Sequence, residues 1–510
     1  MANLYTLFNE VARSRPNKDA IIFEDEATSY NDLLNRIDLF SSNLNRLKSE
    51  EQAHIAVCLP NSSDLIAIAF AVAKLRLTLI PISDSLKPVQ IRDLLQSTDC
   101  DFLITSAYTS SVLSDLESFT NIQTFSVDKL HQVISDTDMI PVKSSDQKDF
   151  LIILSSGSTG QPKPIVLSQD VKIKRSLQAR DMFSVTESDI VLCASPFFHS
   201  LGQRLSFLPL LLGSTLILLD KFTPAKWLDA VANHAVSFTI PVSSHLAALQ
   251  TDLVNHYQRL SSLRAIVSSS AYIEPVLKKL FQDELNCEFH EMYGATEVAT
   301  ATDLSPQAPL DKAMSVGKAW HDVDIKIIDD NLQVIESGVI GEIACKTPLM
   351  FSGYYKQVEL TSESMLGDYF LTGDLGYLDS DGYLYYRSRK KDIIISGGIN
   401  IIPADIENVI CLHPNISECV VIGIKDKYFG EAVYAICTCL QDNPAQELEL
   451  RRFIKDKLAN YQYPLGYDFV ESIKLTETGK FDKVYLRKFY NDKELDLSRN
   501  LRTLMKTHNR

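Results

Sequence analysis

The chain has 510 residues, of which 45% are hydrophobic and 23% are charged. These values are ordinary for a soluble globular protein, and they exclude disorder, collagen-like repeats and a coiled coil as the main architecture. The 50 basic and 65 acidic residues give a net charge of −15. Because such a surface repels polyanions, we expect no nucleic acid partner.

The cysteines and the apolar segments indicate where the protein works. Nine scattered cysteines with no CxxC pair disfavour a disulfide framework and structural zinc, and they favour a reducing compartment. The first residues lack the basic head and apolar stretch of a signal peptide. The longest clean apolar run, Leu65–Ala73, is too short for a bilayer span. We therefore expect a cytoplasmic protein without a transmembrane segment.

From about residue 20 to residue 300, short β-rich segments alternate with helical ones. This alternation predicts an α/β fold, with parallel sheets covered by helices on both faces. The predicted helices are Asn31–Leu44, Asp64–Lys74 and Val89–Ser97. The predicted strands are Ile21–Phe23, His54–Leu59, Leu79–Ile82, Phe102–Thr105, Leu151–Leu154, Ile190–Ala194, Ser214–Leu219, Ser237–Ile240, Ala265–Ser268 and Cys287–Glu291.

The pattern changes after about residue 315. Turn residues between β-rich segments predict hairpins over residues 324–335 and 377–386. The basic trio Arg389–Lys391 precedes a fresh unit, with a helix at Pro403–Val409 and strands at Glu418–Gly423 and Ala432–Leu440. We therefore predict an N-terminal domain over residues 1–388, a hinge at 389–391 and a small C-terminal domain over 392–510.

The segment Leu151–Lys163 carries the most chemical information. A buried strand leads into a loop of glycine and hydroxyl residues that ends in a lysine. Glycines let backbone N–H groups approach an anion, hydroxyls donate to phosphate oxygens, and lysine supplies a mobile charge. The spacing excludes a Walker A loop. The segment indicates a phosphate-binding loop, with a flexible surface loop as the alternative.

Three later segments carry charged groups at predicted turns. Glu291–Glu297 places carboxylates, a hydroxyl and an aromatic ring after a strand, which suits a Mg²⁺–phosphate site beside a purine. Asp374 is expected on a tight turn, where it could accept the hydroxyls of a ribose. Lys480 follows a glycine near the C-terminus. For each segment alone, an ordinary turn or a solvated face is the alternative.

In this order, these segments resemble the motifs of the adenylate-forming superfamily, the AMP-dependent synthetase and ligase family. It includes acyl-CoA synthetases, adenylation domains of peptide synthetases, and luciferase. The resemblance runs from about residue 20 to about residue 490. It implies a large N-terminal domain of αβαβα-layered sheets with a β-rich subdomain, and a small mobile C-terminal α+β domain.

The resemblance also implies a role for each matching residue. It implies an ATP/AMP-binding site formed by Ser155, Ser156, Gly157, Ser158, Thr159, Gly160, Lys163, Ser269, Ser270, Ala271, Tyr293, Gly294, Thr296, Asp374 and Arg389. The implied catalytic residues are Lys480, Thr296 and Glu297, of which Glu297 binds the metal. The implied acyl and thiol channel includes His199, Ser243, Gly397 and Gly398, and Lys391 falls on the hinge. Departures from the family pattern stand at Arg76, Pro164, Gln169, Ser269, Ser270 and Lys474.

The resemblance implies a ligase that uses ATP and Mg²⁺. A carboxylic acid becomes an acyl-adenylate with release of pyrophosphate, and the thiol of CoA then takes the acyl group and frees AMP. Amino-acid-activating members carry an aspartate where this chain reads Phe197–Ser200, so we expect a fatty or aryl acid and not an α-amino acid. One alternative is a free-standing ligase that loads the phosphopantetheine of a separate acyl carrier protein. A second is a non-catalytic nucleotide-binding scaffold.

Overall fold

The structure is a computed structural model that describes residues 3–47, 53–106, 122–132, 149–155, 163–269, 280–440, 445–476 and 480–493. The described residues divide into two compact units. The large unit holds those of 1–157, 161–325 and 345–370, and the small unit holds those of 326–344 and 371–510. The hinge expected at residues 389–391 stays a prediction.

The larger of the two sheets in the large unit has nine described strands. Its order is β15-β14-β13-β12-β11-β9-β10-β1-β2. The strands from β13 to β1 in this order run parallel, as expected, and antiparallel strands flank them on both sides. In the same order, the bounds are Lys318–Ala319, Ala299–Leu304, Glu288–Ala295, Ala265–Ser269, Phe238–Thr239, Ile190–Cys193, Thr215–Leu218, Asp19–Phe23 and Glu26–Ser29.

A second sheet of the large unit has seven described strands, in the order β18-β8-β7-β4-β3-β5-β6. Strands β7, β4, β3, β5 and β6 are parallel, whereas β8 is antiparallel to both of its neighbours. In sheet order, the bounds are Gly353–Tyr354, Lys163–Leu167, Leu151–Ser155, Thr78–Ile82, His54–Cys58, Phe102–Thr105 and Gln123–Ser126.

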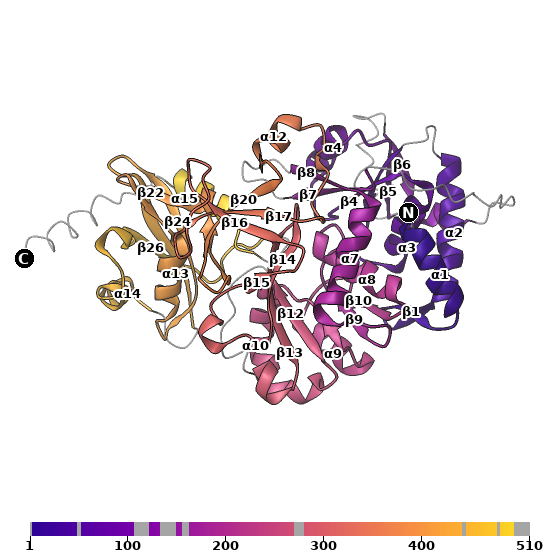
Figure 1. The fold of residues 1–510 in the computed structure, drawn as a ribbon, viewed down its shortest axis with the longest axis horizontal. Coiled ribbons are helices and arrows are strands. Elements are labelled where there is room, and N and C mark those ends of the chain that lie inside the picture. The colour runs from indigo at the N-terminus through magenta and orange to yellow at the C-terminus, as the bar shows by residue number, and fades with distance from the viewer. Residues whose placement is uncertain are drawn as a thin grey trace, which may run out of the picture. The chain divides into compact units, whose positions relative to one another are not determined.

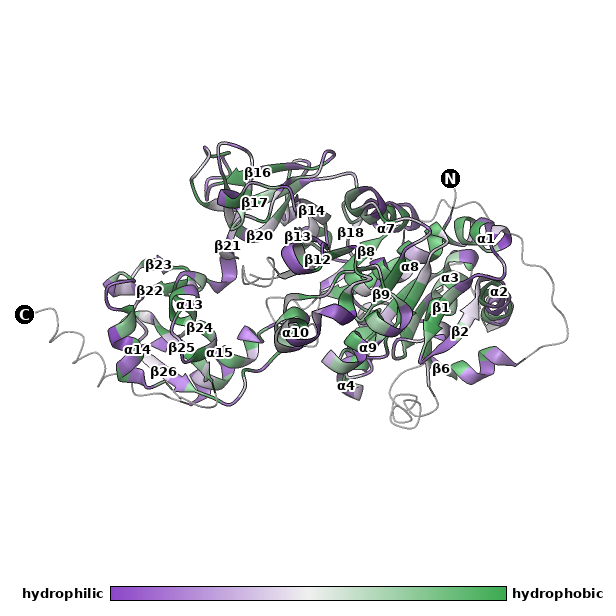
Figure 2. Ribbon diagram, turned by 90° about the horizontal axis from the view of Figure 1, so that it is seen from below, coloured by the Kyte–Doolittle hydropathy of each residue, from purple (hydrophilic) through white to green (hydrophobic). Residues whose placement is uncertain are grey.

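One layer of helices lies between the two sheets (Figure 1). It contains α1 (Leu4–Ser14), α3 (Ser63–Leu75), α7 (Gln169–Phe183) and α8 (Ser200–Leu212). Helix α8 packs on β9 and β10 of one sheet, α3 packs on β4 of the other, and α1 contacts both helices. Helix α2 (Tyr30–Leu47) packs against α1 and α3. Strands such as β1, β8 and β9 are hydrophobic, as Figure 2 shows, because layers cover both of their faces.

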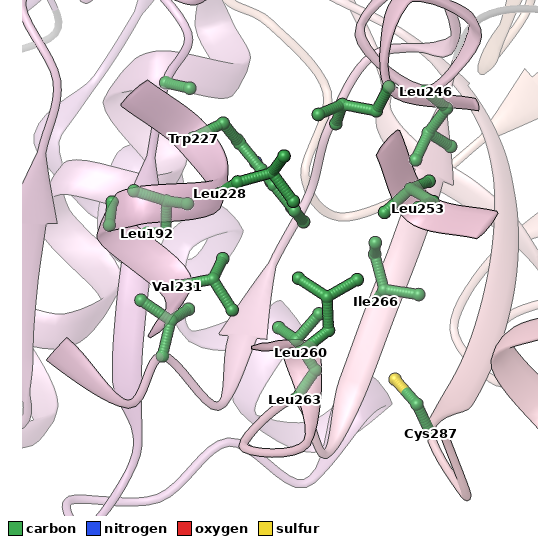
Figure 3. Packing of buried hydrophobic residues seen from close by; sticks show 14 of the residues in the cluster. Leu192, Trp227, Leu228, Val231, Leu246, Leu253, Leu260, Leu263, Ile266 and Cys287 are labelled. Carbon is green, nitrogen blue, oxygen red and sulfur yellow. The ribbon is translucent and has the colours of Figure 1, made fainter. Parts of the chain in front are cut away.

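Helices also cover the outer face of each sheet. On the nine-stranded sheet, α9 (Pro224–His234) and α10 (Ser243–His256) pack on the strands through buried Trp227, Val231 and Leu246 (Figure 3). On the seven-stranded sheet, α4 (Pro88–Ser97) packs on the outer face through Ile91 and Leu95. The order of layers is therefore αβαβα, which confirms the expected fold class.

The small unit contains most of one antiparallel sheet and the whole of another. The first has the order β16-β17-β20-β19, with β21 on β20, and the second has the order β23-β22-β25-β24, with β26 on β25. Their bounds, in these orders, are Asp324–Ile328, Gly341–Lys346, Tyr369–Leu378, Met365–Leu366 and Leu384–Arg389, then Ile399–Ile401, Ile394–Ser396, Gly430–Cys439, Ile416–Asp426 and Gly466–Phe469. The described α-helices of the small unit are α13 (Pro403–Cys411), α14 (Glu447–Ile454) and α15 (Lys483–Asp492). Helix α12 (Val358–Glu363) belongs to the large unit.

Helix α3 shows how local sequence sets an element. Ser62 caps it by accepting the N–H of Leu65, and nearly every residue is buried, so the helix is apolar on all sides. It ends at Arg76, whose φ of +58° lies in the left-handed region where glycine is usual. In the described part of the chain, no helix has both the length and the hydropathy that a bilayer crossing requires.

We predict that Arg76→Gly stabilises the protein by about 1 kcal/mol, because glycine adopts the left-handed conformation without the Cβ clash of other residues. The urea midpoint of the full chain measures this. Arg76→Ala is the matched control, since it removes the same side chain but keeps the strain. A glycine variant that is less stable than the alanine variant would contradict the prediction.

Candidate functional site

Strands β7 and β8 form the hairpin that carries the predicted phosphate loop. Ser155 ends β7 and pairs with Lys163, which begins β8. Pro164 has no N–H, but its carbonyl accepts the N–H of Tyr355 at 2.8 Å. Lys163 thus stands at the start of a strand, where pairing with β7 fixes its backbone.

The predicted Mg²⁺ and adenine motif lies on the hairpin of β13 and β14. Tyr293 and Gly294 lie near the end of β13, and Thr296 and Glu297 belong to the turn that follows. Gly294 pairs with Thr300, and a Cβ at Gly294 would lie 2.0 Å from the carbonyl oxygen of Ala299. Only glycine therefore permits this close pairing beside the turn.

Tyr354 joins the two hairpins, and sequence reasoning did not find it. Its hydroxyl donates to Glu297 Oε1 at 2.9 Å, and the Lys163 ammonium lies 5.3 Å from its ring centroid. Burial and the Glu297 carboxylate raise the pKa of the Tyr354 hydroxyl, so it stays a donor. The structure therefore brings together Lys163 and Glu297, which lie 134 residues apart in the chain. The sequence around Tyr354 shows no motif, so this contact could not be predicted from the sequence.

Arg175 is a second residue that sequence reasoning missed. It lies on α7 with its side chain buried, and its guanidinium donates to three backbone carbonyls. The acceptors are Thr296 at 2.6 Å, Glu297 at 2.8 Å and Leu349 at 2.6 and 2.9 Å. Because a guanidinium holds its donors in a fixed plane, this contact sets the backbone of the Thr296–Glu297 turn.

The other predicted residues of the large unit lie on neighbouring elements. Ser269 ends β12, pairs with Met292 of β13 and forms a bridge with Val242. Ser243 begins α10 directly after that bridge. His199 precedes α8 as its N-cap residue. Of the predicted site, Ser156, Gly157, Ser158, Thr159, Gly160, Ser270 and Ala271 lie outside the described residues.

In the small unit, Asp374 and Arg389 are cross-strand partners on β20 and β21. The Arg389 Nε lies 2.8 Å from Asp374 Oδ1, and Asp374 is 1% exposed. The expectation of a tight turn at Asp374 is wrong, because the residue lies inside a ten-residue strand. Pairing with β17 and β21 extends this strand well beyond the short segment that periodicity predicted.

Lys480 belongs to the same unit and interacts with this pair. Its backbone N–H donates to Thr476 Oγ1 at 3.2 Å. Desolvation by the surrounding chain and the positive charge of Arg389 lower the pKa of its ammonium, and Asp374 partly opposes them. Three of the predicted charged groups therefore lie within electrostatic range of one another in the small unit.

The remaining predicted residues lie around the basic trio. Lys391 lies in a single 3-10 turn, Lys390–Asp392, that follows β21. Gly397 and Gly398 connect β22 and β23 with φ values of +58° and +83°. Both angles favour glycine, so the pair makes a tight hairpin turn that side chains do not fill.

Comparison with protein families gives two matches. A family described as AMP-binding enzyme matches residues 8–355, and one described as AMP-binding enzyme C-terminal domain matches residues 405–480. Together they span both units of the structure.

Comparison with individual proteins gives likeness over nearly the whole chain. An uncharacterized acyl–CoA ligase of Bacillus subtilis is 27% identical, and the match covers 95% of this chain and 98% of that protein. A fatty acid–[acyl-carrier-protein] ligase of Streptomyces coeruleorubidus is 26% identical, with 94% and 95% covered.

Solved structures share the fold. o-Succinylbenzoate coenzyme A synthetase from Bacillus subtilis, in complex with ATP and magnesium ion, matches with a TM-score of 0.84 at 26% identity, covering 94% of this chain and 98% of that one. The same enzyme in complex with its acyl-adenylate intermediate matches with a TM-score of 0.84 at 25% identity, covering 95% of this chain and 98% of that one.

We predict that Arg389→Met raises the pKa of Lys480, because it removes a neighbouring positive charge that disfavours the ammonium. Competitive acetylation followed by mass spectrometry, over a range of pH, measures this pKa in the full chain. Arg389→Lys keeps the charge and is the matched control, which should leave the pKa low. A fall in the pKa of Lys480 in the methionine variant would show that the electrostatic assignment is wrong.

Proposed function

Because the chain belongs to the AMP-binding enzyme family, we propose that it joins a carboxylic acid to a thiol through an acyl-adenylate, at the expense of ATP. This membership confirms the resemblance inferred from the motifs and the expectation of an AMP-forming ligase. The observation that carries the proposal is the cluster of Asp374, Arg389 and Lys480 in the small unit. It combines a buried carboxylate, suited to a ribose, with a lysine of lowered pKa.

The chemical difficulty is electrostatic. The acid is an anion and ATP is a polyanion, so the attack of a carboxylate oxygen on the α-phosphorus brings like charges together. Catalysis therefore needs positioned cations and donors more than acid–base groups. In our proposal, Lys480 lies between the two anions as the P–O bond forms and pyrophosphate leaves. Asp374 and Arg389 hold the ribose, which presents the α-phosphorus in line.

The residues around Glu297 fit a Mg²⁺ ion. Tyr354 donates to one carboxylate oxygen of Glu297, which leaves the other oxygen as a ligand. The described residues hold no cluster of three metal-binding side chains. That absence is compatible with Mg²⁺, which takes one or two carboxylates and completes its shell with phosphate oxygens and water. When bound, the ion neutralises phosphate charge, while Lys163 and Thr296 contact the phosphate oxygens.

The second step transfers the acyl group to a thiol. In our proposal, Lys391 serves as the hinge about which the C-terminal part turns. The turn at Gly397 and Gly398 then borders the thiol channel, and CoA is the acceptor that we favour. The Streptomyces relative favours a carrier protein as the second candidate. Both acceptors present the same thiol arm, so an assay that offers CoA and a phosphopantetheinylated carrier in turn distinguishes them.

The acid is proposed to be fatty or aryl and to lack an α-amino group. Phe197–Ser200 offers no carboxylate to pair with a substrate ammonium, and Phe197 is buried. His199 precedes α8 and Ser243 begins α10. Both residues are proposed to border the acid. The two-unit arrangement allows one site to run two reactions in turn.

We predict that Lys480→Ala lowers carboxylate-dependent pyrophosphate exchange by about 10²- to 10³-fold, the size expected for one lost transition-state charge contact. A panel of fatty, aryl, short and amino acids first identifies the acid on which the wild type acts. If no acid in the panel supports pyrophosphate exchange by the wild type, the proposed function is overturned.

The same variant should still convert a pre-made acyl-adenylate to thioester at close to the wild-type rate, because that step does not use the lysine. Lys455→Ala, on the exposed surface of the small unit, is the matched control for both assays. Equal losses in both half-reactions would contradict the role given to Lys480.

We predict that Tyr354→Phe raises the Mg²⁺ concentration needed for half-maximal exchange, because Glu297 loses the hydroxyl that orients it. Glu297→Gln, which removes the ligand charge, should raise this requirement further. Tyr355→Phe alters a neighbouring hydroxyl that bonds Asp99 instead, and it should leave the requirement unchanged. An unchanged Mg²⁺ requirement in Tyr354→Phe would rule out this positioning role.

A further inference from the structure

Helix α7 buries an unusual number of polar side chains. The fully or nearly fully buried ones are Gln169, Lys172, Arg175, Ser176 and Gln178. Lys172 and Arg175 are each 1% exposed, and Arg204 on the adjacent helix α8 is 6% exposed. Three cations therefore share the interior between α7, α8 and the hairpin of β13 and β14. Cations are rarely buried in this way unless an anion pairs with them.

Two of these cations have few hydrogen-bond partners among the described residues, and all of these partners are neutral. Lys172 Nζ donates to Gln203 Oε1 at 2.9 Å and lies 5.7 Å from the ring centroid of Phe207. Arg204 Nη1 donates to Thr300 Oγ1 at 2.5 Å, with Met292 Sδ at 3.7 Å. No carboxylate of the described chain forms an ion pair with either of them. Arg175 differs, because its guanidinium makes four hydrogen bonds to three backbone carbonyls.

The electrostatics indicate missing negative charge. Burial lowers the pKa of Arg204 to about 10. Burial, with the charges of Arg175 and Arg204, lowers the pKa of Lys172 well below its usual value. The cations thus disfavour one another in a medium of low dielectric constant, and an anion between them would reverse this effect.

Gln203 supplies an independent indication. It is 0% exposed, and its Oε1 accepts from Lys172, but its Nε2 has no hydrogen-bond partner in the part of the chain that the structure describes. A buried donor without an acceptor is costly and needs an explanation. The donors of Lys172, Gln203 and Arg204 therefore all lack the same thing, which is an acceptor with negative charge.

The cluster adjoins the elements of the candidate site. Arg204 lies five residues after His199 along α8, about 7.5 Å along the helix axis. Thr300 is the cross-strand partner of Gly294. The same helix start and the same hairpin therefore carry both the proposed acyl and nucleotide residues and this cluster.

We propose that Lys172, Gln203, Arg204 and Thr300 bind a second carboxylate, at the end of the acid far from the reacting group. The substrate is then a dicarboxylic acid, activated at one end and held by charge at the other. This inference rests on the proposed function for its reaction, but the binding site itself stands on the buried donors alone.

The test compares matched acids on the full-length protein. α,ω-Dicarboxylic acids of three to ten carbons, and isophthalate, are each compared with the monocarboxylate of equal length and with the corresponding monoamide. Pyrophosphate exchange measures activation, and the shift in melting temperature without ATP measures binding. We expect one diacid to exceed both of its matched acids by about tenfold or more in kcat/KM and to raise the melting temperature most, as expected for charged hydrogen bonds.

Variants then assign the effect to the cluster. Arg204→Met should lower kcat/KM for the preferred diacid about 10- to 100-fold and should leave or improve that of the monocarboxylate. Arg204→Lys keeps the charge and should retain part of the preference, even if the methionine variant fails to fold. Arg180→Met changes an exposed arginine on the same helix α7, paired with Asp181, and should keep the wild-type preference.

The outcomes separate this inference from the proposed function. Exchange that is equal for diacids and monocarboxylates overturns the dicarboxylate site and leaves the ligase proposal intact. A monoamide that performs as well as the diacid also overturns it, because a neutral polar group then suffices. A diacid that stabilises the wild type but not Arg204→Met, with no exchange for any acid, supports the site and overturns the ligase proposal.

Discussion

The buried guanidinium of Arg175 is the interaction on which the candidate site of the large unit depends. No other side chain could replace this arginine, because its planar donors reach the carbonyls of Thr296, Glu297 and Leu349 together. Phe351 adds a second tie, since its N–H donates to the Glu297 carbonyl at 2.7 Å. The segment that leads to Tyr354 is thereby held against the turn that carries Glu297. Burying this charge costs several kcal/mol, which its four hydrogen bonds offset.

Much of the fold could be predicted from the sequence, because its elements follow strong local patterns. The alternation before residue 300 predicted the parallel strands, and the observed bounds differ by one or two residues at most ends. Helix α3 was predicted as Asp64–Lys74 and spans Ser63–Leu75. The hairpin at residues 377–386 is present as β20 and β21. The length of β20 was predicted too short. Its first half forms a strand because it pairs with neighbouring strands, and local propensity does not predict such pairing.

The candidate site was predictable only where chemistry and spacing coincide along the chain. Glycines, hydroxyls and lone charges at predicted turns pointed to Lys163, Glu297 and Asp374. Tyr354 and Arg175 have no such pattern, because their importance arises from contacts across more than fifty residues of sequence. Polar residues on an amphipathic helix normally face water. Lys172 and Arg175 therefore read as surface residues until the packing of α7 between two sheets buries them.

The pairing of Gly294 with Thr300 has a consequence for how such a protein can diversify. In our proposals, Gly294 borders the nucleotide and its cross-strand partner Thr300 borders the acid, and Gly294 tolerates no side chain. A shift of register by one residue would disturb both at once. In our proposals, a change of acid preference is therefore more accessible to mutation on α7 and α8, whose inward side chains can vary without altering this hairpin. The hairpin of β13 and β14 is then the part that tolerates few substitutions, and the two helices are the part where substitutions can change the preferred acid.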